Sequence, residues 1–285
     1  MHELLNIRTG KIIAFPSDIA ELTPDQYLFY IDLAFQYFNG IIKDVFEVKR
    51  RLFVYLTDLK VSAKMNFYQP EMLDAIWSAV AAHIDLMDSF FDIEVTETGR
   101  SYRMHTECVL QLLPEWKQFS TYSDIFEEMK WGEFRKCCDL FKMIKLETDR
   151  GNDKQADELV RELFFTLYKS KKKPNPKQKI PESVLFHALN YFSYIFHLVT
   201  TTPIEINGEE IDFSQLWGDE DQNNTSEPNK LGWNAVHFEL SEKGVFGTAE
   251  QADKEKFMNV FLWMYKQRMD ALQLEKRINK SNSND

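Results

Sequence analysis

The chain has 285 residues with a formal net charge of −11, and it contains only 10 glycines and 9 prolines. This acidic balance disfavours general affinity for nucleic acid or anionic lipid. Few glycines and prolines favour long regular elements over a β-sandwich or a barrel. No apolar run approaches ~18 residues and no signal-peptide core is visible, so we expect a cytoplasmic protein that binds neither nucleic acid nor a membrane.

The first predicted elements are a β-hairpin and a helix. The hairpin spans 4–15, where two apolar runs flank a short polar turn. The helix begins after Thr23, which supplies a capping hydroxyl, while Pro24 takes the first helical position and Gln26 the third. Its apolar residues recur every three or four positions as far as Gly40.

The middle of the chain continues this helical pattern, with one interruption. Between 93 and 104 apolar and charged residues alternate around Thr98-Gly99, which predicts a second hairpin. Apolar spacing predicts helices on both sides of it, and for the last of these Asn152 is the expected cap, supported by Gln155. The predicted helices are 42–58, 70–90, 126–146 and 152–168.

Residues 170–180 are rich in lysine and proline and are predicted to be a linker. Helices are predicted at 181–201 and 233–240, and a last helix at 248–277 opens with a second capping box. A turn at 204–209, an acidic polar segment at 218–230 and a turn at 244–247 separate these helices. We therefore predict a mainly α fold: a compact multi-helix domain of about eight helices with two minor β-hairpins. Its parts are an N-terminal half (1–169), the linker, and a C-terminal half (181–285) packed on the first.

Residues that could carry chemistry are scattered. No His or Cys pair has metal-ligand spacing, and no phosphate-binding glycine loop or nucleophile motif occurs. Cys108, Cys137 and Cys138 are expected to be reduced, buried apolar groups. The alternative for the adjacent pair is oxidant sensing, which would require a lowered thiol pKa. We expect no enzyme activity, no cofactor and no metal.

Two segments are candidates for binding a partner. Lys171, Lys172 and Lys173 belong to a group of six lysines within 169–179, a solvated loop that could touch an acidic segment of another protein. The second candidate lies on the last helix, beyond the point where the core should end. There aromatic, Met and Arg side chains, which are common at interface centres, share one face. These residues are Tyr265, Arg268, Met269 and Leu272. The alternative is that they cap the domain's own core.

Three stretches carry a family resemblance. Residues 15–27 (FPSDIAELTPDQY) resemble the opening of uncharacterised tail-region proteins of Bacteroidota phages and prophages, which begin with a short strand pair and two helices. The motifs at 131–134 (WGEF) and 244–247 (GVFG) agree in order. The resemblance implies a virion-associated or tail-assembly protein, whose partners would be other phage structural or assembly proteins, and it supplies no catalytic residues. The longer linkers and the acidic segment depart from this family.

Three functions are therefore open. The first is a phage-associated structural or tail-assembly protein that acts by protein–protein contact, as a homo-oligomer or with other chains, in the bacterial host cytoplasm or in the virion. The second is a cytoplasmic helical adaptor or regulatory protein unrelated to virions. The third is an enzyme whose site is assembled from residues that spacing in the sequence does not reveal.

Overall fold

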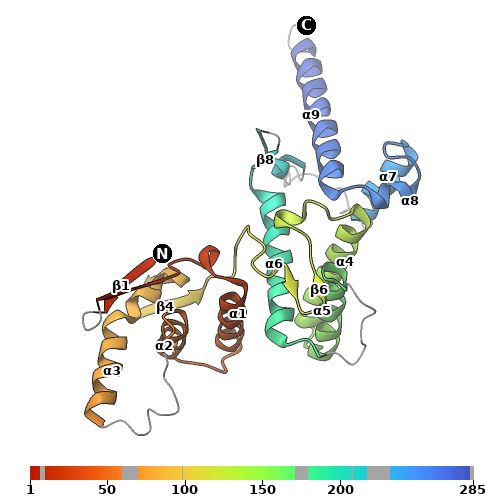
Figure 1. Ribbon diagram of the computed structural model, residues 1–285. Coiled ribbons are helices and arrows are strands. Elements are labelled where there is room, and N and C mark those ends of the chain that lie inside the picture. Colours follow the sequence, from red (N-terminus) through yellow and green to blue (C-terminus); the bar gives the residue numbers. More distant parts are fainter. Residues whose placement is uncertain are drawn as a thin grey trace. The chain divides into compact units, whose positions relative to one another are not determined.

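The chain is mainly α-helical, with small antiparallel sheets, as predicted (Figure 1). Nine α-helices lie in the part of the chain that the computed structural model describes. The described residues are 1–6, 10–59, 70–97, 99–170, 179–206, 208–216 and 232–282.

The chain divides into two compact units, each made of two separate stretches of sequence. Unit 1 contains Met1–Trp116 and Pro174–Tyr191, and unit 2 contains Lys117–Lys173 and Phe192–Asp285. The division into halves at 1–169 and 181–285 stays a prediction, since residues 171–178 of the proposed linker lie outside the described residues.

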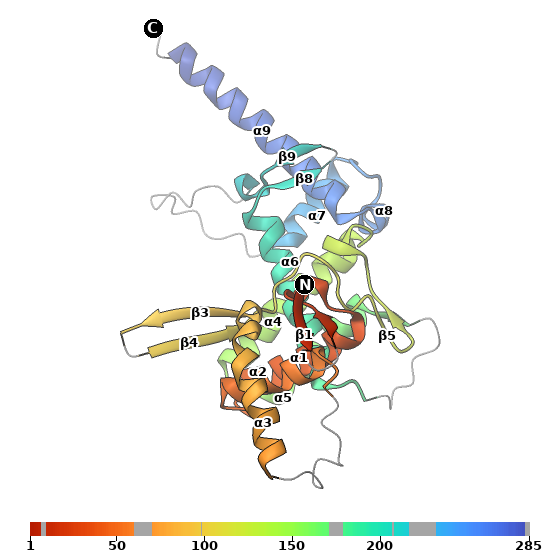
Figure 2. The same ribbon diagram turned by 60° about the vertical axis from the view of Figure 1, so that its left-hand side comes forward.

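Unit 1 combines two hairpins with three helices and the first part of a fourth. Both hairpins are those expected from the sequence: His2 pairs with Phe15 in the first, and Phe91 pairs with Met104 in the second. Figure 2 shows the second hairpin as two long yellow strands. The elements of unit 1 are β1 (His2–Asn6), β2 (Lys11–Phe15), α1 (Pro24–Phe38), α2 (Val45–Leu56), α3 (Pro70–His83), β3 (Phe91–Thr96), β4 (Gly99–Met104), β5 (Glu115–Trp116) and the beginning of α6 (Glu182–Thr201).

The core of unit 1 is built on the inner faces of α1 and α2. In α1 the Thr23 hydroxyl accepts a hydrogen bond from the Gln26 amide, and the Gln26 side chain accepts one from the Thr23 amide, so the predicted capping box is present. Apolar spacing then directs one side of each helix inward. The buried residues include Tyr27, Tyr30, Ile31 and Ala34 of α1 and Val48, Leu52 and Phe53 of α2.

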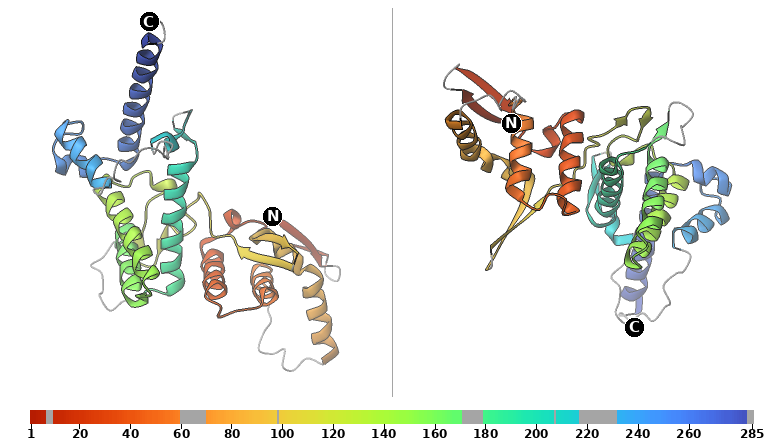
Figure 3. Two further views of the ribbon diagram at one scale, coloured as in Figure 1. Left: turned by 180° about the vertical axis from the view of Figure 1, so that it is seen from behind. Right: turned by 90° about the horizontal axis from the view of Figure 1, so that it is seen from below.

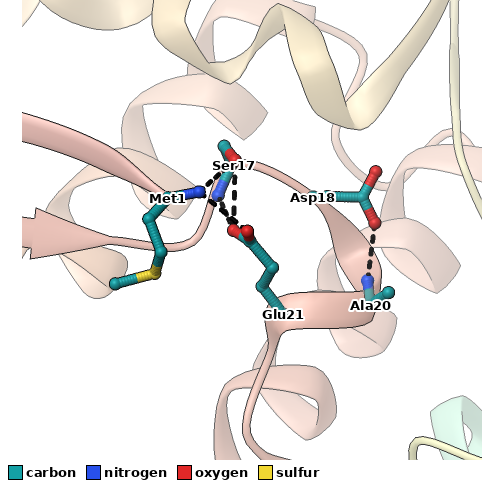
Figure 4. A network of polar contacts seen from close by, with 5 residues as sticks. All are labelled: Met1, Ser17, Asp18, Ala20 and Glu21. Carbon is teal, nitrogen blue, oxygen red and sulfur yellow. Dashed lines mark hydrogen bonds and ion pairs between the residues drawn. The ribbon is translucent and has the colours of Figure 1, made fainter.

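A polar network holds the connection between β2 and α1, which contains a short 3₁₀ helix at Ile19–Glu21 (Figure 4). The Glu21 carboxylate accepts hydrogen bonds from the Ser17 amide at 2.7 Å and from the Met1 amino group at 2.7 Å. The Asp18 carboxylate caps the 3₁₀ helix through the Ala20 amide. The hydrogen bond from the Met1 ammonium and that from the Ser17 amide lower the pKa of Glu21 to about 2.

The helix predicted at 70–90 changes character within its length. α3 ends at His83, and a 3₁₀ helix runs from Ile84 to Phe90 before β3 begins. The tighter winding ends at Phe90, which is fully buried and whose carbonyl accepts a hydrogen bond from the Tyr30 hydroxyl at 3.2 Å. The spacing of apolar residues does not distinguish an α-helix from a 3₁₀ helix over so short a segment, because both place every third residue on one side.

Unit 2 is built around α4 and α5, which form an antiparallel pair, and the second part of α6 (Figure 1). Its elements are β6 (Phe119–Ser120), α4 (Trp131–Asp149), α5 (Asp153–Leu167), β7 (Lys169–Ser170), the rest of α6, β8 (Ile204–Ile206), β9 (Glu209–Ile211), α7 (Trp233–Glu242), α8 (Ala249–Lys254) and α9 (Phe257–Asn282). β6 pairs with β7, and β8 pairs with β9 on either side of the turn expected at 204–209. The acidic segment predicted at 218–230 lies outside the described residues.

Aromatic rings fill the core of unit 2. Phe134 of α4 stacks on Phe257 of α9 with ring centroids 4.7 Å apart, and it meets Phe261 edge to face at 5.5 Å. Trp131 packs against both Phe134 and Trp233 of α7. Such pairs add specific geometry to the burial of large apolar surface. The high phenylalanine content of the sequence is thus used to join α4, α7 and α9.

The single helix predicted at 248–277 is two helices. α8 begins with the expected capping box at Thr248 and Gln251, but Glu255 is extended, and α9 begins at Phe257. The break is made by backbone hydrogen bonds to a distant segment: the Trp131 amide donates to the Glu255 carbonyl at 2.7 Å, and the Phe257 amide donates to the Met129 carbonyl at 3.0 Å. A carbonyl and an amide used in this way are not available to a continuous helix.

Asn152 is the N-cap residue of α5, as predicted, but it does not cap the helix through its side chain. The Asn152 side chain makes no capping hydrogen bond and instead donates to the Glu147 carboxylate at 2.6 Å. The helix begins at Asp153, directly after Asn152, so the predicted cap position is confirmed while the expected capping contact is wrong.

Candidate interaction surface

α9 changes from a core helix to an exposed helix along its length. Phe257, Val260 and Phe261 in its first two turns are fully buried in unit 2. From Lys266 onward most side chains are exposed, and in Figures 1 and 3 the distal half of the helix extends past the other elements of unit 2. This pattern agrees with the expectation that the core ends partway along this helix.

The face of α9 predicted to bind a partner is half-buried. Tyr265 lies edge to face against Phe213, with ring centroids 5.9 Å apart, so its ring belongs to the packing of unit 2. Arg268, Met269 and Leu272 are also half-buried, and the Arg268 Nε atom is hidden from solvent with no hydrogen-bond partner among the described residues. Their role in binding another protein stays a prediction. The other predicted residues, Lys171, Lys172 and Lys173, lie outside the described residues.

The opposite face of α9 carries exposed apolar residues that the sequence interpretation did not identify. Leu274 is 59% exposed and Ile278 is 49% exposed, and Ala271 and Gln267 on the same side are exposed as well. The separation of these four positions is four, three and four residues, which is the spacing of positions that face a second helix in a coiled coil. That spacing was the signal in the sequence that could have indicated this face. We call these four residues the α9 stripe.

A polar cluster joins α4, α7 and α8 in unit 2. The Arg135 guanidinium donates to Asn234 Oδ1 at 2.6 Å and pairs with Asp253 Oδ1 at 2.5 Å. His237 Nδ1 lies 3.5 Å from the same Asp253 oxygen. Burial lowers the pKa of His237, and the nearby Arg135 charge lowers it further. Among the described residues, Arg135 Nε and His237 Nδ1 are buried without a hydrogen-bond partner. The contacts that the cluster does make hold the two short helices against α4.

A second buried cluster lies in unit 1 and contains His187 of α6. Gln111 Oε1 accepts a hydrogen bond from the Leu113 amide at 3.1 Å, so this oxygen is an acceptor, and His187 Nε2 at 3.1 Å must donate to it. His187 Nδ1 then accepts from the Tyr27 hydroxyl, 2.8 Å away. This arrangement requires a neutral imidazole, and burial lowers the pKa of His187 to about 3.

Lys49 of α2 is buried among aromatic rings in unit 1. Its side chain is 1% exposed, its ammonium pairs with Asp88, and its Nζ atom lies 4.3 Å from the centroid of the Tyr102 ring. The Phe91 ring is 5.6 Å from the same atom. A buried ammonium is tolerated only when it is paired, and here the carboxylate and the π faces supply that compensation. Lys49 thereby ties α2 to the β3–β4 hairpin.

The adjacent cysteines are buried thiols. Cys137 is fully buried and Cys138 nearly so, while Cys108 is half-buried, and all three are free. Burial raises the pKa of the Cys137 thiol to about 12 and that of Cys138 well above its ordinary value. The oxidant-sensing alternative required a lowered thiol pKa, so this part of the interpretation is contradicted for the adjacent pair.

A cavity of about 430 Å³ lies beside α4 in unit 2. The rings of Phe141, Phe192 and Trp233 form part of its wall, and the exposed Lys142 and Lys145 lie at its edge. Among the described residues, no group of three or more His, Cys, Asp or Glu is placed to hold a metal ion. In the same part of the chain no helix combines the length and the apolar character needed to cross a membrane.

Comparisons with known proteins give no relative of this chain: no family model, no curated protein and no solved structure matches it.

Proposed function

We propose that this protein acts by protein–protein contact, without catalysis, as a structural or tail-assembly component of a phage or prophage. The distal part of α9 is its contact element. The observation that carries the contact role is the exposure of Leu274 and Ile278 on a helix whose beginning is anchored in the core of unit 2. The phage setting rests on the resemblance at 15–27, 131–134 and 244–247.

The architecture of α9 supports this role. An anchored helix that extends from a packed unit presents side chains in a fixed orientation, since its first turns are held by Phe134 and its later turns by their own hydrogen bonds. Exposed apolar side chains at regular spacing are a common basis for binding an amphipathic or helical partner. The chain would then work in the cytoplasm of a bacterial host or remain in the virion.

Truncation after Lys266 tests the contact role. Phe257, Val260 and Phe261 stay in the shortened chain, so we expect it to fold with a thermal transition close to that of the full chain. It should lose binding to the tail and assembly proteins encoded beside it, as measured by co-purification of the co-expressed proteins. A chain ending after Arg277 loses only Ile278 from the α9 stripe, and it serves as a control of intermediate length. If the truncated chain unfolds, the end of α9 belongs to the core; if it still binds, the contact lies elsewhere.

The phage setting needs a separate measurement. Mass spectrometry of purified particles, and of assembly intermediates from an induced host, should detect the chain in one of the two fractions. Flanking genes for a tail tube or a tape measure would agree with that result. A chain absent from both fractions and encoded in a metabolic operon would refute the phage assignment and favour a cytoplasmic adaptor.

A further inference from the structure

The α9 stripe has the spacing of a coiled-coil seam over two heptads. Gln267, Ala271, Leu274 and Ile278 are all exposed and follow one another at four, three and four residues. On an α-helix such positions form a narrow line, and two helices with this line pack side by side. We propose that α9 pairs in an antiparallel orientation with α9 of a second copy of this chain. This inference rests on the proposed contact role of α9 and names its partner.

The charges beside the stripe indicate the second copy as the partner. In an antiparallel pair, Ala271 faces Leu274 of the second copy, and Gln267 faces its Ile278. On one flank, Arg268 then comes beside Glu275 of the second copy. On the other flank, Asp270 comes beside the second copy's Arg277. Two-fold symmetry produces each of these opposite-charge contacts twice, so the helix is complementary in charge to itself.

The same charges oppose a parallel pair. In a parallel arrangement, Asp270 of one helix lies beside Glu275 of the other helix, because flanking residues five positions apart meet across a parallel seam. Two carboxylates would then meet on each side of the seam. Since flanking charges set the orientation of helix pairs, the antiparallel arrangement is favoured.

Within the described part of the chain, these flanking charges have no partner. Among the described residues, no hydrogen bond or ion pair is found for Arg268, Asp270, Glu275 or Arg277. Arg268 and Glu275 also have no charged residue three or four positions away on α9. The buried Nε atom of Arg268 also lacks a hydrogen-bond acceptor among the described residues. A carboxylate from a second copy would place a negative charge beside this guanidinium.

Charge reversal followed by sedimentation equilibrium of the full chain is the test. Arg268→Glu and Glu275→Arg should each weaken self-association about tenfold, because each replaces two attractive contacts by two repulsive ones. The double variant Arg268→Glu/Glu275→Arg should restore the wild-type association constant. Lys276→Glu, a reversal at an exposed position on the opposite side of α9 from the stripe, is the matched control and should leave association unchanged. Circular dichroism checks that each variant keeps its helix content.

Two further variants test the seam and its direction. Leu274→Asp should weaken self-association by about a hundredfold or more, since it places a charge at the centre of the seam. Asp270→Arg should weaken an antiparallel pair, by facing Arg277 of the second copy, but strengthen a parallel one, by facing its Glu275. A wild-type chain that stays monomeric at ~100 µM, or a double variant that is not restored, would overturn the pairing. The contact role would survive that result if truncation after Lys266 still abolished binding to another protein.

Discussion

Lowering the pH from 7 to 5 should destabilise unit 1 through His187. The folded chain holds this imidazole neutral, because Nε2 donates to Gln111 and Nδ1 accepts from Tyr27 in a site without access to water. Its pKa is about 3 in the folded chain, against an ordinary value of 6.5. The unfolded chain therefore takes up a proton below pH 6.5, while the folded chain does not.

The size of the effect follows from proton linkage. A depressed folded pKa contributes stability that is fully present above pH 6.5 and is lost as the pH falls towards 3. Each pH unit inside this window changes the free energy of unfolding by about 1.4 kcal/mol for one proton. Between pH 6.5 and pH 5, His187 should thus remove about 2 kcal/mol of stability.

Urea denaturation at pH 7 and pH 5, followed by far-UV circular dichroism, measures this loss. The control is His187→Gln, which keeps a polar side chain at the site but does not titrate. The readout is the change in the free energy of unfolding between the two pH values, compared between the two proteins. The other histidines and the carboxylates contribute equally to this change in both proteins, so they cancel in the comparison. The pH-dependent loss should be about 2 kcal/mol larger in the wild type than in the variant. Equal losses in the two proteins would show that His187 is not held neutral, and the inferred hydrogen-bond pattern would be wrong.

Two other substitutions test the contacts described above. Asp88→Asn leaves the ammonium of the buried Lys49 without its carboxylate, so we expect urea denaturation to show a loss of about 3 kcal/mol in the free energy of unfolding. The control, Asp85→Asn at an exposed position of the same 3₁₀ helix, should cost less than ~0.5 kcal/mol. Equal effects would refute the role of the pair. Gly132→Ala should destabilise the wild type, because its Cβ would lie 3.0 Å from Asp253 Cγ and 3.2 Å from Asp253 Cβ. In an Asp253→Gly background, which lacks both atoms, the same substitution should stabilise the fold by up to ~1 kcal/mol through reduced backbone freedom. The same sign in both backgrounds would contradict this close contact.

Local signals in the sequence located most elements of the fold. The start of α1 was predicted correctly because a capping box uses only neighbouring groups, here Thr23 and Gln26. The two predicted hairpins were found for a similar reason, since alternation and a turn are both short-range patterns. The division of the last helix was missed because it depends on Met129 and Trp131, more than a hundred residues away in the chain.

The candidate surface shows the same limit. Tyr265 and Leu272 were selected because aromatic and apolar residues shared a face, but the sequence alone did not say which face of α9 its own unit covers. That depends on where Phe213 lies. The structure leaves Leu274 and Ile278 exposed, so the stripe became recognisable only when the covered side of the helix was known.

The sequence by itself determined the helical class, the two hairpins and the beginnings of α1 and α8, because capping and periodicity act between residues a few positions apart. Only the tertiary structure decided that His187 is a neutral donor to Gln111, that Lys49 pairs with Asp88, and that Glu255 interrupts a helix. Each of these depends on groups far apart in the sequence whose approach is set by burial of the apolar faces, and burial is non-directional. A pattern along the chain shows that a face will be covered, whereas the packed fold shows which element covers it.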